Sequence, residues 1–223
     1  MSQPRPAGWR ALPVSLAVLG LLLAACDLGV GGAPSGLAPI ECPTAPPDVT
    51  TARRAVVGTT LGNLTIELYP EAAPMATANF AALARCGFYE GITFHRVLAG
   101  FVAQTGDPAT RDNSGEFPGL GTGGPGYGFA VEIPPEGLNY DPYIVAMANT
   151  GLPNSNGSQF FICLADLNSQ LERTYSIFGR VVEGSEVVDA IGQVEVNDPL
   201  KGIPVDPVVI DWIVIQGAES TAE

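Results

Sequence analysis

The side chain best suited to chemistry in this chain is Arg96, which lies in the otherwise apolar run 94–104. Alternate residues of an extended strand point to the same face, so Arg96 shares a face with Phe94 and Leu98. An arginine in such a strand forms an ion pair, extends to the surface or takes part in catalysis. The adjacent His95 could act as a general base, although a hydrogen-bonded packing residue is the commoner arrangement for a single histidine.

Other kinds of reactive site lack their residues. The four cysteines show no Cys-x-x-Cys spacing, and with one histidine the chain offers no usual set of zinc ligands. The run 121–126 is rich in glycine but lacks the lysine and the following helix of a phosphate-binding loop, which favours a surface loop. No Ser-His-Asp order and no paired carboxylates stand out. We therefore expect no metal and no cofactor.

Composition limits the possible partners. The 223 residues carry a formal net charge of -13 and show no basic stripe, so nucleic acid is not expected as a partner. The length is sufficient for one domain with a substantial core. Glycine (27) and proline (20) are abundant, which favours many turns and long loops over a helical bundle.

The N-terminus has the features of an export signal. Arg5 and Arg10 precede an apolar run, 11–25, that is too short to cross a bilayer as a helix. The run ends in small residues before Cys26, which resembles the lipobox of bacterial lipoproteins, where the cysteine carries the lipid. The alternative is an ordinary cleavable signal in which Cys26 is incidental.

We therefore predict four parts along the chain. Residues 1–25 form a lipoprotein signal peptide, and 26–53 form a flexible tether rich in Gly and Pro. Residues 54–217 form the globular domain, and 218–223 form a short tail. Cys42 and Cys86 could pair in an oxidising compartment, or they could remain free thiols like Cys163 in a buried strand.

Short β-rich runs dominate the predicted domain. Strands are expected over 55–60, 63–69, 93–97, 101–104, 143–148, 159–164, 176–182 and 208–215. Pro74 and Gly87 bound a first helix, and Ser185 and Gly192 bound a short second one. Because closure removes exposed edges, we predict a closed eight-stranded antiparallel barrel capped by two helices.

Several long motifs in this order carry a family resemblance. The run 89–107 resembles the cyclophilin signature, and further matches follow at 147–149, 156–162 and 178–181. The resemblance covers about 55–215. It implies an eight-stranded barrel closed by two helices, which agrees with the pattern above, and it implies isomerisation of X-Pro peptide bonds.

The resemblance also implies roles for individual residues. Arg96 is the implied catalytic arginine, and Gln104 is implied to orient it and to contact the substrate backbone. His95 supports them. The residues implied to bind the peptide are Phe101, Val102, Phe161 and Leu171 for the proline ring, Ala148 and Asn149 for the residues before it, and Tyr175 where many relatives have histidine.

These features together predict an isomerase that acts on proline-containing polypeptides during folding of exported proteins. We expect a monomer outside the cytoplasm, held at a bacterial membrane by a lipid on Cys26. The alternative function is a non-catalytic module of the cell envelope that binds proline peptides or acts as a holdase, and only turnover distinguishes the two. The stretch 111–120 is inserted relative to the family pattern, so substrate specificity could differ.

Overall fold

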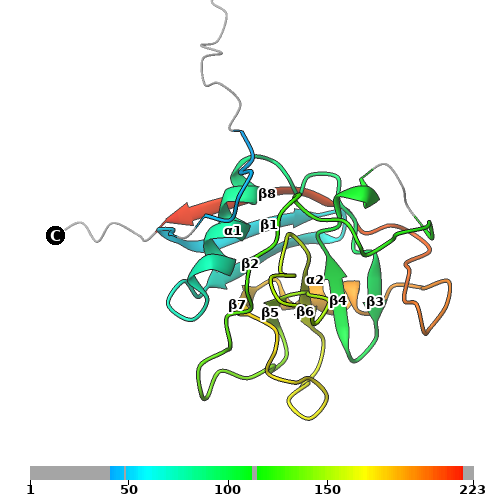
Figure 1. Ribbon diagram of the computed structural model, residues 1–223. Helices are drawn as coiled ribbons and strands as arrows, with labels where there is room; N and C mark the ends of the chain where they lie inside the picture. Colours follow the sequence, from blue (N-terminus) through cyan, green and yellow to red (C-terminus); the bar gives the residue numbers. More distant parts are fainter. Residues whose placement is uncertain (1–40, 48, 112–114, 218–223) are drawn as a thin grey trace, which may run out of the picture. The chain divides into compact units, whose positions relative to one another are not determined.

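The computed structural model describes residues 41–47, 49–111 and 115–217, and these form one eight-stranded antiparallel sheet with two α-helices. The strands follow the order β3-β4-β6-β5-β7-β2-β1-β8 and can be traced in Figure 1. The elements are β1 Ala52–Thr59, β2 Gly62–Leu68, α1 Pro74–Arg85, β3 Arg96–Leu98, β4 Val102–Thr105, the 3-10 helix η1 Pro108–Thr110, β5 Ile144–Met147, β6 Phe160–Cys163, β7 Ile177–Glu183, α2 Ser185–Ile191 and β8 Ile210–Gly217.

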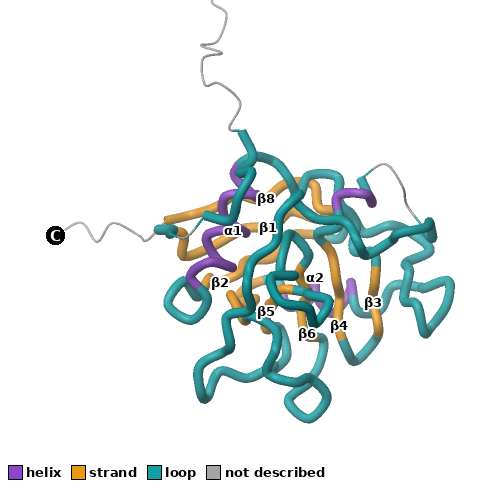
Figure 2. The backbone as a smooth tube through the Cα atoms, viewed as in Figure 1, coloured by secondary structure: helices purple, strands orange, loops and turns teal. Residues whose placement is uncertain are grey.

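Parts of the sequence prediction lie outside these residues. The predicted signal peptide 1–25, the predicted lipidation site Cys26 and the predicted tail 218–223 are not described. Long loops connect several of the short strands, as Figure 2 shows. No helix in the described ranges has the length and apolar character needed to cross a bilayer.

The sheet curls into a barrel-like form, but the predicted full closure is overstated. The end strands β3 and β8 share no ladder. Instead, the segment before β3 meets the start of β8 through backbone bonds, with the Phe94 N–H donating to Val208 O at 2.9 Å and the Ile210 N–H donating to Ile92 O at 2.8 Å. The reason is the shortness of β3, which has three residues and pairs with β4 along one edge.

An aromatic cluster fixes α1 on the sheet. The Phe80 ring of α1 lies 5.1 Å from the Phe178 ring of β7 and 5.5 Å from the Phe160 ring of β6, measured between ring centroids. Tyr89, just after the helix, packs 5.4 Å from Phe80. All four side chains are buried, and large buried rings contribute strongly to a core. This cluster lies in the main core, to which β3 and β4 contribute Val97 and Ala103. The residues that alternate with these two are available for the site.

The helix N-termini are capped in ways that local sequence does not reveal. Ala73 precedes α1 and offers no capping side chain, but the Glu132 carboxylate accepts from the Met75 and Ala76 N–H groups at 2.8 Å each. For α2, the predicted capping role of Ser185 is wrong. Gly184 is the N-cap, with φ +78° and no room for a Cβ beside β2.

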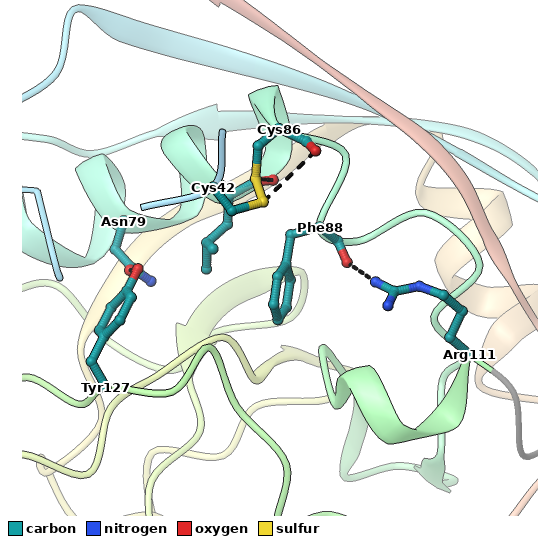
Figure 3. Close-up of a disulfide and its surroundings, with 7 residues drawn as sticks. Cys42, Asn79, Cys86, Phe88, Arg111 and Tyr127 are labelled. Atoms are coloured by element: carbon teal, nitrogen blue, oxygen red, sulfur yellow. Dashed lines mark hydrogen bonds between the residues drawn. A yellow bond between two sulfur atoms is a disulfide. The ribbon is translucent and has the colours of Figure 1, made fainter. Parts of the chain in front are cut away.

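A disulfide joins Cys42 to Cys86, which follows α1, so the pairing that the sequence left open is resolved (Figure 3). The bond ties the segment before β1 to the end of the helix. β1 itself begins at Ala52, so the predicted domain boundary at residue 54 falls inside this strand. Cys163 is free and buried in β6, and burial raises the pKa of its thiol to about 12.

The disulfide is expected to contribute to stability by restricting the unfolded chain. The bonded cysteines are 44 residues apart, and we expect Cys42→Ser to lower the free energy of unfolding by about 2–4 kcal/mol. Urea unfolding of the oxidised protein and the variant measures this difference. As a control, reducing agent should destabilise the wild type and leave the variant unchanged. Equal midpoints for the oxidised wild type and the variant would contradict the expectation.

Candidate active site

One row of side chains crosses four neighbouring strands and forms the floor of the site. Arg96 on β3 lies opposite Gln104 on β4, Gln104 lies opposite Phe161 on β6, and Phe161 lies opposite Ala146 on β5. Directly opposed residues of antiparallel strands share a face. Adjacent strands are about 4.8 Å apart, so the Arg96 and Phe161 backbones are about 10 Å apart. The pairing register thus brings together residues that are 65 positions apart in the sequence.

An apolar cluster surrounds the Phe161 end of this row and is separate from the main core. Phe161 and Val102 are buried in it, and the Tyr175 ring meets the Phe161 ring edge-on at 5.5 Å. Six of the seven residues predicted to bind the peptide belong to this one cluster: Phe101, Val102, Ala148, Phe161, Leu171 and Tyr175. A partly open apolar cluster of this kind can hold a small ring such as that of proline.

Arg96 is half-buried, with no carboxylate within ion-pair distance among the described residues. Its guanidinium carbon lies 5.8 Å from the centroid of the Phe101 ring, and its Nη1 donates to Gln104 Oε1 at 3.5 Å. Burial lowers the pKa of Arg96, but an arginine side chain remains protonated in proteins. Three roles were considered for this arginine, and the described residues exclude an ion pair. The positive charge of Arg96 faces the apolar cluster through the Phe101 ring.

A chain of hydrogen bonds fixes the orientation of Gln104. Its Nε2 donates to Gln159 Oε1 at 3.0 Å, which leaves Gln104 Oε1 facing Arg96. The Gln159 Nε2 donates in turn to Gly121 O at 2.9 Å and Gly123 O at 2.8 Å. The Gly121 and Gly123 N–H groups donate to Asp107 Oδ2 at 2.7 and 3.3 Å. The buried Asp107 carboxylate thereby fixes the glycine loop, and the loop carbonyls fix the side chains of Gln159 and Gln104.

Sequence reasoning assigned no role to Asp107 or Gln159, although both lie inside the motifs that carry the resemblance. The glycine-rich run is a surface loop, as predicted, but its glycines have a specific use. A Cβ on Gly123 would overlap the Asp107 carboxylate, and Gly106, at φ +93°, lies against the Ser158 backbone. The signal that could have identified this arrangement is a carboxylate with no basic neighbour in an apolar motif, because such a group needs N–H donors.

Asn149 occupies a groove beside the apolar cluster instead of the cluster itself. The groove has a volume of about 480 Å³, with Gln104, Ala148 and Asn149 on one side and the 121–128 loop on the other. Asn149 Nδ2 donates to Thr174 O at 2.9 Å, which holds the amide in place. The groove opens next to Gln104, so a peptide bound over the row can extend into it.

His95 is buried beside the site, as a packing residue would be, but the expected hydrogen bond is absent. Neither ring nitrogen has a hydrogen-bond partner in the described part of the chain; Thr93 and the Gln159 amide lie nearby without meeting hydrogen-bond geometry. Burial lowers the pKa of His95 to about 4, and the nearby Asp107 only partly opposes this shift. His95 is therefore neutral at pH 7, and its covered nitrogens do not fit the general-base alternative.

The chain is similar to one family of known proteins. Residues 54–214 match the family described as "Cyclophilin type peptidyl-prolyl cis-trans isomerase/CLD". Peptidyl-prolyl cis-trans isomerase A of Mycobacterium tuberculosis is 41% identical over 179 residues, which cover 72% of this chain and 91% of that protein. Peptidyl-prolyl cis-trans isomerase-like 1 of Mus musculus is 40% identical over 168 residues, which cover 74% and 93%.

Solved structures agree with these matches. A crystal structure of a Cryptosporidium parvum cyclophilin type peptidyl-prolyl cis-trans isomerase in the presence of the dipeptide Ala-Pro superposes with a TM-score of 0.64. Its sequence is 36% identical, and the match covers 74% of this chain and 99% of that one. The family match, over 54–214, includes the strands that carry the row.

The burial of His95 predicts a pH dependence of stability. Because its folded pKa of about 4 lies below the ordinary value of 6.5, the unfolded chain binds the extra proton between these values. Stability is therefore expected to fall as the pH drops from 6.5 to 4, by about 3 kcal/mol from this residue alone. Unfolding of wild type and His95→Asn at a series of pH values measures the difference in slope, which cancels the shared carboxylates. Parallel curves would contradict the assignment.

Proposed function

This chain belongs to the cyclophilin family of peptidyl-prolyl cis-trans isomerases, and from this premise we propose that it speeds rotation of X-Pro bonds in exported polypeptides through Arg96. The single observation that carries the proposal is the half-buried, unpaired guanidinium in one cross-strand row with Phe161. We further propose that a lipid on Cys26 holds the enzyme at a bacterial membrane.

The reaction needs no bond to be made or broken. Amide resonance produces a rotation barrier of about 18–20 kcal/mol, and uncatalysed X-Pro exchange takes tens to hundreds of seconds. In the twisted transition state the resonance is lost and the proline nitrogen becomes pyramidal, with a localised lone pair. A catalyst therefore has to stabilise that nitrogen and allow one side of the bond to turn.

Arg96 is suited to the first of these tasks. Its guanidinium keeps its charge and presents donors in a fixed plane toward the developing lone pair. The adjacent apolar cluster limits access of water, which strengthens this interaction. An acceleration of about 10⁵-fold corresponds to roughly 7 kcal/mol. One preorganised donor contributes about 3–4 kcal/mol of this on the evidence of other enzymes, and positioning of the peptide supplies the remainder.

The other predicted residues are suited to positioning. Phe101, Phe161 and Leu171 hold the proline ring, while the residues before it lie along Ala148 and Asn149. Gln104 bonds the substrate backbone and keeps Arg96 in place through its own fixed amide. The relative from Cryptosporidium parvum studied with Ala-Pro supports a proline dipeptide as the minimal ligand.

We expect Arg96→Ala to keep the fold and to lower kcat/KM about 10²–10³-fold, because the transition-state donor is lost. The rate is measured on an Ala-Pro peptide by NMR exchange or a protease-coupled assay. Arg53→Ala is the matched control, since Arg53 is a partly exposed arginine of β1 that pairs with Glu71, and the variant should retain full activity. Undiminished turnover by Arg96→Ala would refute the mechanism. Binding of the peptide by wild type without turnover would favour the holdase alternative.

The proposed location has support from the sequence and from one structural feature. The Cys42–Cys86 disulfide suits an oxidising compartment outside the cytoplasm. A net charge of -13 suits a protein that remains soluble beyond its anchor. A lipid on Cys26 would keep the domain near emerging exported chains, whose X-Pro bonds start as mixtures of isomers.

Fractionation tests the anchor. In a bacterium that processes lipoproteins, the wild-type protein is expected in the membrane fraction, and Cys26→Ser is expected to lose that association. Cys163→Ser is the control, because that cysteine is buried in the domain and should not affect fractionation. Equal solubility of wild type and Cys26→Ser would contradict lipidation without affecting the proposed catalysis.

A further inference from the structure

A second hollow begins where the catalytic row ends. It has a volume of about 450 Å³, within the usual range for ligand sites, and Arg96 and Gln104 form its inner end. One edge of β3 pairs with β4, and on the other edge the Val97 N–H donates to Gly202 O at 2.6 Å. The segment 200–203 therefore forms the wall on the side of β3 away from Phe161.

The opposite wall is formed by residues 116–121, and an ion pair joins the two walls. Lys201 Nζ lies 2.6 Å from Glu116 Oε1, and both side chains are about half exposed. Leu200, at 88% exposure, and Phe117 add apolar surface to the hollow. Glu116 and Phe117 belong to the stretch 111–120, which is predicted to be an insertion relative to the family pattern.

The order of the row gives a direction to a bound peptide. In the proposed function the residues before the proline lie toward Ala148, beyond β6, and the proline ring lies at Phe161. The chain that follows the proline then passes Arg96 and leaves across the outer edge of β3, where the hollow begins. A site that shares Arg96 and Gln104 with the catalytic row is continuous with it.

We infer that this hollow binds the substrate residues that follow the proline and prefers an acidic side chain among them. The inference rests on the proposed function, because the peptide must first lie over the row. It adds a specificity that neither the fold nor the family match assigns, and it makes Lys201 the specificity-determining residue.

The charges that line the hollow support this preference. Arg96 and Lys201 are cationic, Glu116 is anionic and already paired, and the lining His95 is neutral at pH 7. An acidic substrate side chain gains Lys201 as a partner, whereas a basic one meets both cations and must displace Lys201 to reach Glu116. The net charge of -13 has the opposite sign, but charges beyond about 8 Å are screened at physiological salt.

Two peptides test the inference. They are identical through an Ala-Pro bond and one following residue, have blocked ends, and differ only by Glu or Lys at the second position after the proline. A third peptide ends at the residue that follows the proline. NMR exchange rates at physiological salt give kcat/KM for each. We expect the wild type to favour the Glu peptide over the Lys peptide by about two- to fivefold, the range of an exposed ion pair.

The variants identify the source of that ratio. Lys201→Gln should bring it close to one, and Glu116→Gln should raise it, because Lys201 is then unpaired. Arg53→Gln removes one positive charge from the other surface ion pair and should leave the ratio and the turnover unchanged. A wild-type ratio near one, or a ratio that Lys201→Gln does not change, would overturn the inference. Loss of turnover on all three peptides, the shortest included, would instead refute the proposed function.

Discussion

The site depends on a positive charge that is partly desolvated and has no counter-ion within the described part of the chain. Arg96 lies on a strand, over the Phe101 ring, and its nearest polar contact is the neutral Gln104 amide. A carboxylate in that position would neutralise the guanidinium and so weaken the effect on a developing lone pair that we propose for it. The free-energy cost of desolvating Arg96 is limited because its side chain remains half exposed. The same exposure leaves Arg96 accessible to a substrate.

Keeping such a group in place without an ion pair requires rigid neutral partners. The connected set Gln104, Gln159, Gly121, Gly123 and Asp107 meets this requirement. The Asp107 carboxylate accepts hydrogen bonds from backbone N–H groups of the glycine loop. It is connected to Arg96 only through that loop and the side-chain amides of Gln159 and Gln104. The negative charge of Asp107, which holds the loop, is thus kept apart from the positive charge of Arg96. The glycines of the 121–128 loop allow its backbone to lie close to the Asp107 carboxylate.

The sequence predicted the local parts of this arrangement and missed the long-range ones. Arg96 stood out as a charge in an apolar strand, and the family resemblance implied Gln104 and Phe161. The row follows once those strands pair in register. The cap that Glu132 supplies to α1 was not predictable, since 56 residues separate the donor Ala76 from its acceptor. Barrel closure was overestimated because periodicity cannot show that β3 would have only three residues. His95 shows the same limit: its burial was expected, but whether a partner lies within hydrogen-bonding geometry depends on the packed structure.

The residues of the row lie on strands, whereas the walls of the hollow beyond β3 lie in loops. This difference explains how the fold can keep its reaction while its substrate specificity changes. The row lies on β3, β4, β6 and β5, where shifting a strand by one residue would break its backbone pairing with the neighbouring strands. The walls of the hollow beyond β3 lie in two loops, which tolerate insertion far better than strands do. The predicted insertion at 111–120 could therefore place Glu116 and Phe117 beside Arg96 without altering the register that positions Arg96. If the proposed roles hold, sequence change in these two loops alters which proline peptides enter the site, while the rotation step still depends on the residues of the sheet.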